Sequence, residues 1–377
     1  MNQYVFQRGS LVTALGLALG LSCVSGAQAL SADEIEIHGF FTAGATISDI
    51  EHTYLRTTDE DISFDEDSAL GLQLIVPIDE RIVLQAQLLA NSSKEDQPNF
   101  ELNVDWAFAT YTLNDSVDIR AGRIRYPLLM LSDYAEVGYS YPWIRPPQEM
   151  YGLIPITSFD GIDALITVPV GGFQLNIQPY GGSKDDELHL HAFHQTTDVE
   201  LDNIMGARFT LSGEYLTFSL AANTFDLTIG EAHEGGHGEH HTFTPDLGVE
   251  NIAAGVSLDW NNLLVMTEYF ETRYDDADPG DAQFSDSESW YAMVGYRFGK
   301  LTPHITFSEL KTDNPHGGIA QESLTAGLRY ELSPSSALKF EWTNAEPQDG
   351  TLGLFDVDSL EGEDDVNVYS IALDLVF

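Results

Sequence analysis

From residue 34 to the C-terminus, polar and apolar residues alternate with a period of two in one short segment after another. Residues 173–180, for example, read FQLNIQPY. Successive side chains of a strand point to opposite faces, so this pattern predicts strands with one apolar and one polar face. Sixteen strands are predicted, over residues 34–47, 69–77, 81–90, 100–112, 117–124, 162–169, 173–180, 204–211, 216–229, 252–260, 263–274, 289–298, 301–310, 323–332, 337–343 and 366–377.

The connections between these strands alternate in length. Every second connection is short and rich in turn-forming residues, at 79–80, 114–115, 171–172, 213–214, 261–262, 299–300 and 333–335, whereas the intervening ones are long and polar. An even number of strands of about ten residues, with short turns at one end and long loops at the other, is typical of an outer-membrane barrel. A β-sandwich would bury its apolar face between two sheets and would not need long loops along one edge. We therefore predict an all-β fold, a transmembrane antiparallel β-barrel of about 16 strands.

The N-terminus has the features of a secretory signal peptide. Arg8 precedes an apolar run over residues 11–21, and Ala27 and Ala29 form a small-residue cleavage site. The run is too short for a membrane anchor. Cys23 would be the acylated residue of a lipoprotein, but the residues before it fit that signal poorly. We expect residues 1–29 to be removed, which leaves the barrel domain at 30–377 without cysteine.

The net charge of −44 restricts the partners of this chain. Nucleic-acid binding requires basic surfaces, so nucleic acid is not expected as a partner. The hydrophobic content of 43% argues against disorder for most of the chain. There is no glycine-rich phosphate loop and no G-x-S-x-G elbow, and the mature chain has no cysteine. We therefore expect neither an enzyme nor a protein that needs a cofactor.

One long connection, residues 122–161, differs from the others because it is rich in aromatic residues and proline. A loop of this length is uncommon and usually functional. A barrel of about sixteen strands leaves an aqueous channel, and we expect this apolar loop to fold inward and narrow it. The predicted constriction residues are Arg120, Arg123, Arg125, Asp133, Glu136, Arg145 and Glu149.

Alternation also assigns the faces of the strands. Leu102, Val104, Trp106 and Phe108 are expected to face lipid or a neighbouring subunit together. The predicted basic wall of the lumen consists of Arg208, Arg297, Arg329 and Lys339, with Arg120 on the same face. Arg123 and Arg125 fall on the lipid-facing parity unless Gly122 forms a β-bulge.

Two interpretations of the lumen charges remain open. Loop carboxylates Asp133, Glu136 and Glu149 facing wall arginines would create a transverse field that orients solutes. Alternatively, the basic residues neutralise nearby carboxylates, for example Glu331, Glu341 and Asp105. The sign of the ion selectivity does not follow from the net charge.

Two predicted loops are rich in histidine, at residues 189–194 (HLHAFH) and 233–241 (HEGGHGEHH). The first five residues of the second loop match the zinc-protease pattern HExxH, which requires a helix. Two glycines within the pattern disfavour a helix. Weak binding of Zn²⁺, Cu²⁺ or Ni²⁺ by His233, His237, His240 and His241 is one interpretation, and a solvated tract is the other.

Three loops are acidic, at residues 59–67, 275–281 and 361–365, and none has EF-hand spacing. They are interpreted either as solvated loops that repel one another or as sites that share loop-bound divalent cations with lipopolysaccharide phosphates.

The signal peptide, the sixteen strands, the long third loop and the terminal Phe377 together resemble those of Gram-negative general porins. The resemblance implies outer-membrane localisation, contact with lipid and lipopolysaccharide, a homotrimer, and passive diffusion of small hydrophilic solutes and ions. It also implies that Tyr369 and Phe377 belong to a C-terminal assembly signal. The short acidic motif of many general porins is not evident in the third loop.

Two alternative functions follow from the residues. The first is a substrate-selective channel for a sugar or an anion, with Tyr126, Tyr134, Tyr139 and Trp143 as a sugar slide. The second is a surface metal-binding or adhesive protein that uses its histidine-rich loops and is anchored by the barrel.

Overall fold

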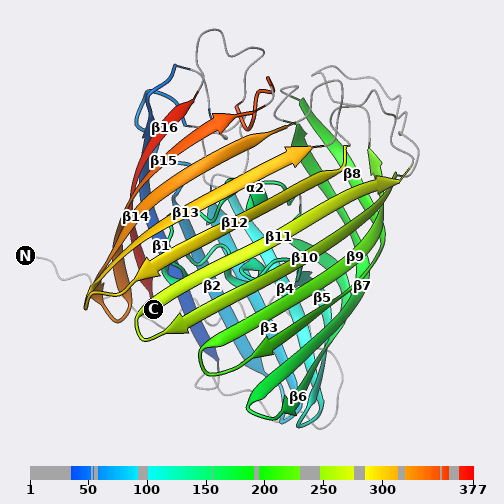
Figure 1. The fold of residues 1–377 in the computed structure, drawn as a ribbon. Helices are drawn as coiled ribbons and strands as arrows, with labels where there is room; N and C mark the ends of the chain where they lie inside the picture. The colour runs from blue at the N-terminus through cyan, green and yellow to red at the C-terminus, as the bar shows by residue number, and fades with distance from the viewer. Residues whose placement is uncertain are drawn as a thin grey trace, which may run out of the picture.

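The structure is a computed structural model that describes residues 35–51, 54, 58–91, 101–154, 156–190, 195–229, 247–275, 285–312, 319–348, 350–355 and 365–377. It confirms the fold class, because sixteen antiparallel strands form one closed barrel (Figure 1). Their bounds are β1 (Glu36–Ser48), β2 (Ala69–Pro77), β3 (Ile82–Asn91), β4 (Glu101–Asn114), β5 (Val117–Arg125), β6 (Ser158–Val170), β7 (Phe173–Leu190), β8 (Gln195–Ser212), β9 (Leu216–Ile229), β10 (Leu247–Trp260), β11 (Leu263–Asp275), β12 (Ser287–Tyr296), β13 (Leu301–Thr312), β14 (Gln321–Ser333), β15 (Ser336–Pro347) and β16 (Val366–Val376).

The first and last strands close the barrel. β1 pairs with β16 from Phe40–Val376 to Ser48–Val368. Gly39 and Phe377 also exchange two backbone hydrogen bonds of 2.9 Å, which extend this ladder to the end of the chain. A closed ladder satisfies the backbone groups of every strand without leaving an edge, which a hydrocarbon environment requires.

The longest strands extend beyond the segments that alternation predicts. β7 and β8 have 18 residues each, whereas residues 173–180 and 204–211 were predicted. The extra part of β7 begins at Gly181 and continues through a charged stretch, where apolar alternation no longer marks a strand. The extra residues of β7 pair with the extra residues of β8 by backbone hydrogen bonds, which do not depend on the side chains.

Short turns connect the strands at the end of the barrel opposite the long loops. In the turn between β10 and β11, Asn261 and Asn262 have positive φ angles of 46° and 72°. Two successive left-handed residues are the geometry of a tight hairpin turn, and asparagine tolerates it.

The two faces of each strand have different environments. On β12, Tyr291 and Met293 are fully buried, while Trp290 and Val294 are exposed. Tyr291 lies edge-on to Trp143 of the long connection after β5, so the buried face is the lumen side. The exposed apolar face is the side that lipid covers.

A bulge in β4 corrects one predicted face. Asp105 has no partner on β3, so the register shifts by one residue there. Leu102 and Val104 stay on the outer face, at 68% and 46% exposed. Phe108 instead packs against buried residues of the lumen, and the ring of Trp106 stacks on it at a centroid distance of 5.3 Å. Trp106 and Phe108 therefore face the lumen and not the lipid, because a one-residue shift exchanges the faces of a strand.

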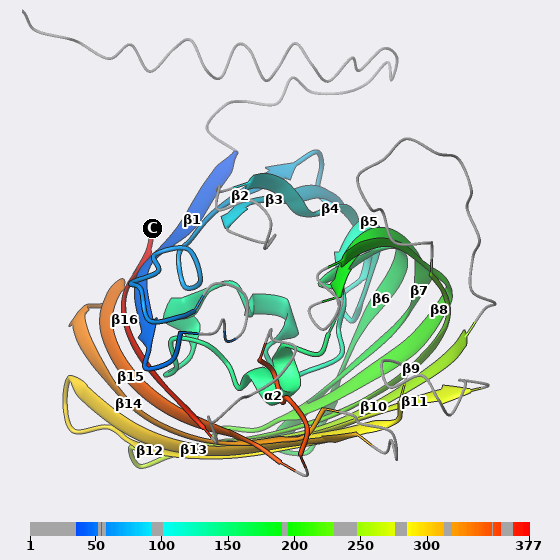
Figure 2. The same ribbon diagram turned by 90° about the horizontal axis from the view of Figure 1, so that it is seen from above.

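The helical turns η2 (Ser132–Tyr134), η3 (Gly138–Ser140) and α2 (Gln148–Tyr151) lie in the connection between β5 and β6. Figure 2 shows this connection inside the ring of strands. No helix among the described residues is long and apolar enough to cross a membrane. The predicted signal peptide lies outside the described residues.

Candidate functional site

The connection between β5 and β6, residues 126–157, is called the inserted loop here. It is shorter than the predicted stretch 122–161, because β5 continues to Arg125 and β6 begins at Ser158. Its apolar side chains form one buried cluster with residues of β6–β12, and Leu129, Trp143 and Met150 are at most 1% exposed. The loop therefore packs against the wall as a small core does.

Trp143 is a central anchor of the inserted loop. Its Nε1 donates a hydrogen bond to Oγ1 of Thr306 on β13 at 2.7 Å. The indole lies edge-on to Tyr291 and to His304, with centroid distances of 5.6 and 6.3 Å. A buried indole usually finds a partner for its N–H group, and here the partner lies on the wall.

Glu268 on β11 forms a second anchor. Its carboxylate accepts hydrogen bonds from the backbone N–H of Met130 at 2.7 Å and from the hydroxyls of Tyr151 and Tyr291. Glu268 is 2% exposed. No pattern in the sequence distinguishes Glu268 from the carboxylates that face solvent.

Glu149 does not face wall arginines, which was one of the two interpretations of the lumen charges. Its carboxylate accepts hydrogen bonds from Ser308 on β13 and from Gln321 and Ser323 on β14. These neutral donors surround a side chain that is 2% exposed. Glu149 therefore attaches α2 to the wall.

Two residues of the predicted basic wall bind the backbone of the inserted loop. Arg329 donates hydrogen bonds to the carbonyl oxygens of Tyr139 and Tyr141, and Lys339 donates to those of Gly138 and Trp143. The ammonium group of Lys339 also lies 2.9 Å from Asp374 on β16, and Arg329 lies 3.2 Å from Glu331. Both cations hold the loop in place.

Arg145 connects the inserted loop to the loop after β1. Its Nε lies 2.9 Å from Oδ1 of Asp67, and its Nη2 donates a hydrogen bond to Ser370 on β16 at 2.6 Å. Asp67 belongs to the first acidic loop, for which solvated carboxylates were one interpretation. It is instead 9% exposed, and it also accepts a hydrogen bond from Thr46.

The remaining predicted arginines also have carboxylate partners. Arg208 pairs with Asp133 of the inserted loop, and Arg120 pairs with Asp163 on β6. Arg125 lies 3.0 Å from Asp105, and Arg297 lies 2.6 Å from Asp259 near the turn that follows β12.

Arg123 is not part of the lumen. It pairs with Asp160 at 3.1 Å, and these side chains are 36% and 54% exposed. Arg123 is three residues from Arg120 on the same strand, so the two side chains point to opposite faces. Gly122 has a φ of 135°, but the registers on both sides of β5 stay in step there, so it forms no bulge.

The inserted loop leaves one side of the lumen free. Its side-chain hydrogen bonds and ion pairs with the strands go to β8 round to β16, and Tyr126 packs against Phe159 of β6 and Tyr180 of β7. No hydrogen bond between residues 126–157 and β2–β5, called the free wall here, is present among the described residues. The free wall carries polar pairs such as Gln73–Gln87 and Thr110–Gln85. Arg120 lies over the ring of Phe108 on the same wall, 4.9 Å from the centroid.

Four aromatic residues were proposed as a sugar slide, and the structure does not bring them together on one open surface. Tyr126 and Trp143 are 3% and 1% exposed, respectively, and pack under the loop. Tyr139 donates a hydrogen bond to the carbonyl of Pro334 and lies under Arg329, and Tyr134 is 37% exposed.

Buried tyrosines in the loop have raised pKa values. Burial raises the pKa of Tyr141 and of Tyr151 well above the ordinary tyrosine value. The charge of Glu136 raises the pKa of Tyr141 further, and that of Glu268 does so for Tyr151. A phenolate is unfavourable in a dry cluster that already holds carboxylates.

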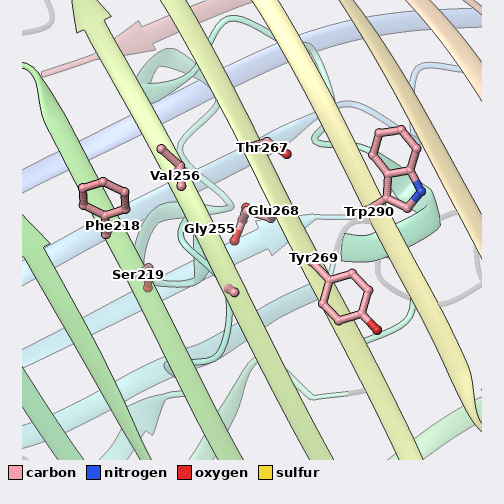
Figure 3. Close-up of a pocket in the computed structure, with 9 residues that line it drawn as sticks. Phe218, Ser219, Gly255, Val256, Thr267, Glu268, Tyr269 and Trp290 are labelled. Carbon is pink, nitrogen blue, oxygen red and sulfur yellow. The ribbon is translucent and has the colours of Figure 1, made fainter.

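Figure 3 shows a depression on the outer face of β9–β12. The side chains of Phe218, Tyr269 and Trp290 point outward around it, whereas Glu268 points to the lumen. Lipid covers this face, so the depression is separate from the channel.

Several predicted residues take no part in the lumen. Tyr369 and Phe377 are 52% and 65% exposed, on the outer face and at the end of β16. The four candidate metal-binding histidines at 233–241 lie outside the described residues. Among the described residues, no cluster of three or more His, Cys, Asp or Glu side chains could hold a metal ion.

Comparisons with known proteins agree with this geometry. The family model described as Gram-negative porin matches residues 12–349. The chain belongs to the Gram-negative porin family. This porin is therefore an outer-membrane channel for passive diffusion. No curated protein matches it.

Solved structures of outer-membrane proteins share the fold of this porin at low sequence identity. The anion-selective porin of Comamonas acidovorans is 13% identical with a TM-score of 0.58, over 91% of this chain and 99% of that chain. Salmonella typhi OmpF, in complex with daunomycin, is 15% identical with a TM-score of 0.58, over 90% and 97%. The channel DcaP of Acinetobacter baumannii is 12% identical with a TM-score of 0.58, over 93% and 100%.

Proposed function

We propose that this porin passes small hydrophilic solutes and ions through an opening between the inserted loop and the free wall of β2–β5, and that the inserted loop is its constriction. The observation that carries the proposal is the one-sided attachment of the loop. Trp143, Glu149 and Arg145 bind it to β13, β14 and β16, while the opposite wall presents glutamine and threonine side chains to the lumen.

We also propose that the protein assembles as a homotrimer in a membrane that contains lipopolysaccharide. The ion pair between Arg123 and Asp160 supports a subunit interface, because it lies on the outer face beside exposed Val104 and Ile162. A charged side chain facing lipid is costly in the hydrocarbon region. A neighbouring subunit over β4–β6 would cover the pair.

Planar-bilayer recording of wild type beside a variant that lacks residues 128–150 tests the constriction. We expect the wild type to show conductance steps in groups of three, one for each subunit. The deletion should enlarge each step, because the lumen loses the loop that narrows it. The matched control deletes residues 233–241 and should leave the conductance unchanged. Unchanged steps in the first deletion would show that the loop is not the constriction.

The wild type and the 233–241 deletion also address the metal-binding alternative. Calorimetric titration with Zn²⁺ should give the same heats for wild type and for the 233–241 deletion. A metal-dependent signal that disappears with this deletion, in a protein that does not conduct, would favour the alternative over the pore.

A further inference from the structure

The inference below rests on the proposed pore and concerns the sign of its ion selectivity. We propose that the channel prefers cations, and that Glu136 on the inserted loop is a selectivity-determining residue at the constriction. The structural basis is the distribution of paired and unpaired charges around the free part of the lumen.

Seven basic residues of the lumen and the inserted loop, among those the structure describes, are neutralised. Each of the seven has a carboxylate partner no more than 3.2 Å away. The pairs are Arg120–Asp163, Arg125–Asp105, Arg145–Asp67, Arg208–Asp133, Arg297–Asp259, Arg329–Glu331 and Lys339–Asp374. Three of these cations, Arg145, Arg329 and Lys339, also donate hydrogen bonds that hold the inserted loop, so they are not available to a passing anion.

Carboxylates remain after this pairing. Among the described residues, Asp118, Glu136, Glu149, Glu268 and Glu341 face the lumen or lie on the inserted loop and take part in none of the seven ion pairs. Glu149, Glu268 and Glu341 accept hydrogen bonds at the contact between the loop and the wall. They therefore act as anchors and lie behind the loop.

Glu136 is placed differently. It is half-buried, and it forms neither a hydrogen bond nor an ion pair with any residue that the structure describes. It lies on the inserted loop between η2 and η3. The other carboxylates of the loop are bound to the wall, since Asp133 pairs with Arg208 and Glu149 accepts hydrogen bonds from β13 and β14. The charge of Glu136 also acts on Asp105 of the free wall. Asp118 on the same wall accepts one hydrogen bond, from Thr112.

The resulting field favours cations. Paired charges cancel at the distance of a passing ion, whereas an unpaired carboxylate in a narrow, low-dielectric lumen concentrates ions of opposite sign. A unit charge about 8 Å from the path of the ion, screened as in water, changes the local concentration of a monovalent ion by about twofold. The same charge lowers the concentration of Cl⁻ by this factor. We therefore expect the ratio of K⁺ to Cl⁻ permeability to exceed one, and Glu136→Gln to lower it about fourfold.

The test is the reversal potential of single channels under a KCl gradient. Wild type, Glu136→Gln and the control Glu80→Gln are compared; Glu80 is exposed in the turn between β2 and β3, and its replacement removes the same charge away from the constriction. We expect a cation-selective wild type, a reduced preference in Glu136→Gln and little change in Glu80→Gln. Conducting channels with a zero or anion-selective reversal potential would overturn the inference and leave the pore intact. Absence of conductance would instead contradict the proposed function.

A cysteine variant separates charge from steric effects. The chain has one cysteine, Cys23 in the predicted signal peptide, so Glu136→Cys gives a single reactive thiol once mass spectrometry verifies that the purified chain lacks Cys23. Labelling with a sulfonate thiosulfonate should restore the cation preference, and labelling with a trimethylammonium thiosulfonate of similar size should lower it further. Equal shifts with both reagents, or no effect of Glu136→Gln in a cation-selective channel, would contradict the role of Glu136.

Discussion

The indole of Trp143 on the inserted loop donates a hydrogen bond to Thr306 on β13, with 2.7 Å between Nε1 and Oγ1. The two residues are 163 positions apart in the sequence, and this bond connects the middle of the loop to a wall strand that comes later in the sequence. Without such bonds, the backbone groups of a loop inside a channel would bind water instead, because the loop has few hydrogen bonds within itself, and the loop would not keep one position. The loop keeps one position because its aromatic residues and its carbonyl oxygens are both bound by the wall.

Replacing Trp143 with alanine should release the loop. Truncation of a fully buried tryptophan costs about 3–5 kcal/mol of packing, and this loss falls on the loop and not on the barrel ladder. We expect frequent current fluctuations in single-channel records and earlier proteolysis within residues 126–157. Trp290→Ala is the control, because Trp290 lies on the outer face of β12. Quiet channels in Trp143→Ala would contradict the anchoring role.

The β4 bulge predicts that Trp106 is accessible from water. Variants that keep Trp106 or Trp260 as the single tryptophan should differ in fluorescence quenching in lipid vesicles. We expect acrylamide to quench Trp106 and brominated lipid to quench Trp260, which is 50% exposed on the outer face. Quenching of Trp106 by brominated lipid would show that Trp106 faces lipid, as simple alternation predicts.

A glycine contact between β6 and β7 should be intolerant of side chains. Gly161 and Gly182 pair in register, and a Cβ added at Gly161 would lie 2.2 Å from the carbonyl oxygen of Gly181. Gly161→Ala forces the two backbones apart, and overpacking of this kind costs about 1–3 kcal/mol. The midpoint of urea unfolding in detergent should fall. Gly172→Ala is the matched control, since no atom lies within 4 Å of its added Cβ.

The buried loop tyrosines predict a change at alkaline pH. The folded pKa of Tyr141 and of Tyr151 is raised above that of the unfolded chain, so the stability that these residues contribute is fully present below pH about 10 and is lost as the pH rises through the folded values. Phenolate absorbance should show a late phase that Tyr141→Phe and Tyr151→Phe each reduce. Titration of both residues together with free tyrosine would show that the loop cluster is hydrated.

The sequence by itself was sufficient to predict the barrel. Alternation with a period of two and turns such as Asn261–Asn262 are local properties, and both follow from the geometry of a single strand or hairpin. They predicted the strand number, the closed sheet and the lipid-facing side of most strands. The composition of the third long connection, between β5 and β6, also indicated a loop that packs into the lumen, because proline and aromatic residues do not favour a solvated loop.

Only the tertiary structure decided the charges of the channel. The bulge at Asp105, which turns Trp106 to the lumen, depends on the pairing of β4 with β3 and has no local signal. Likewise, Arg329 and Lys339 bind loop carbonyls, whereas Glu136 has no cationic partner among the described residues. Ion pairs between residues far apart in the sequence form only when the closed barrel brings their strands together, so alternation places a charge on a face but does not identify its partner.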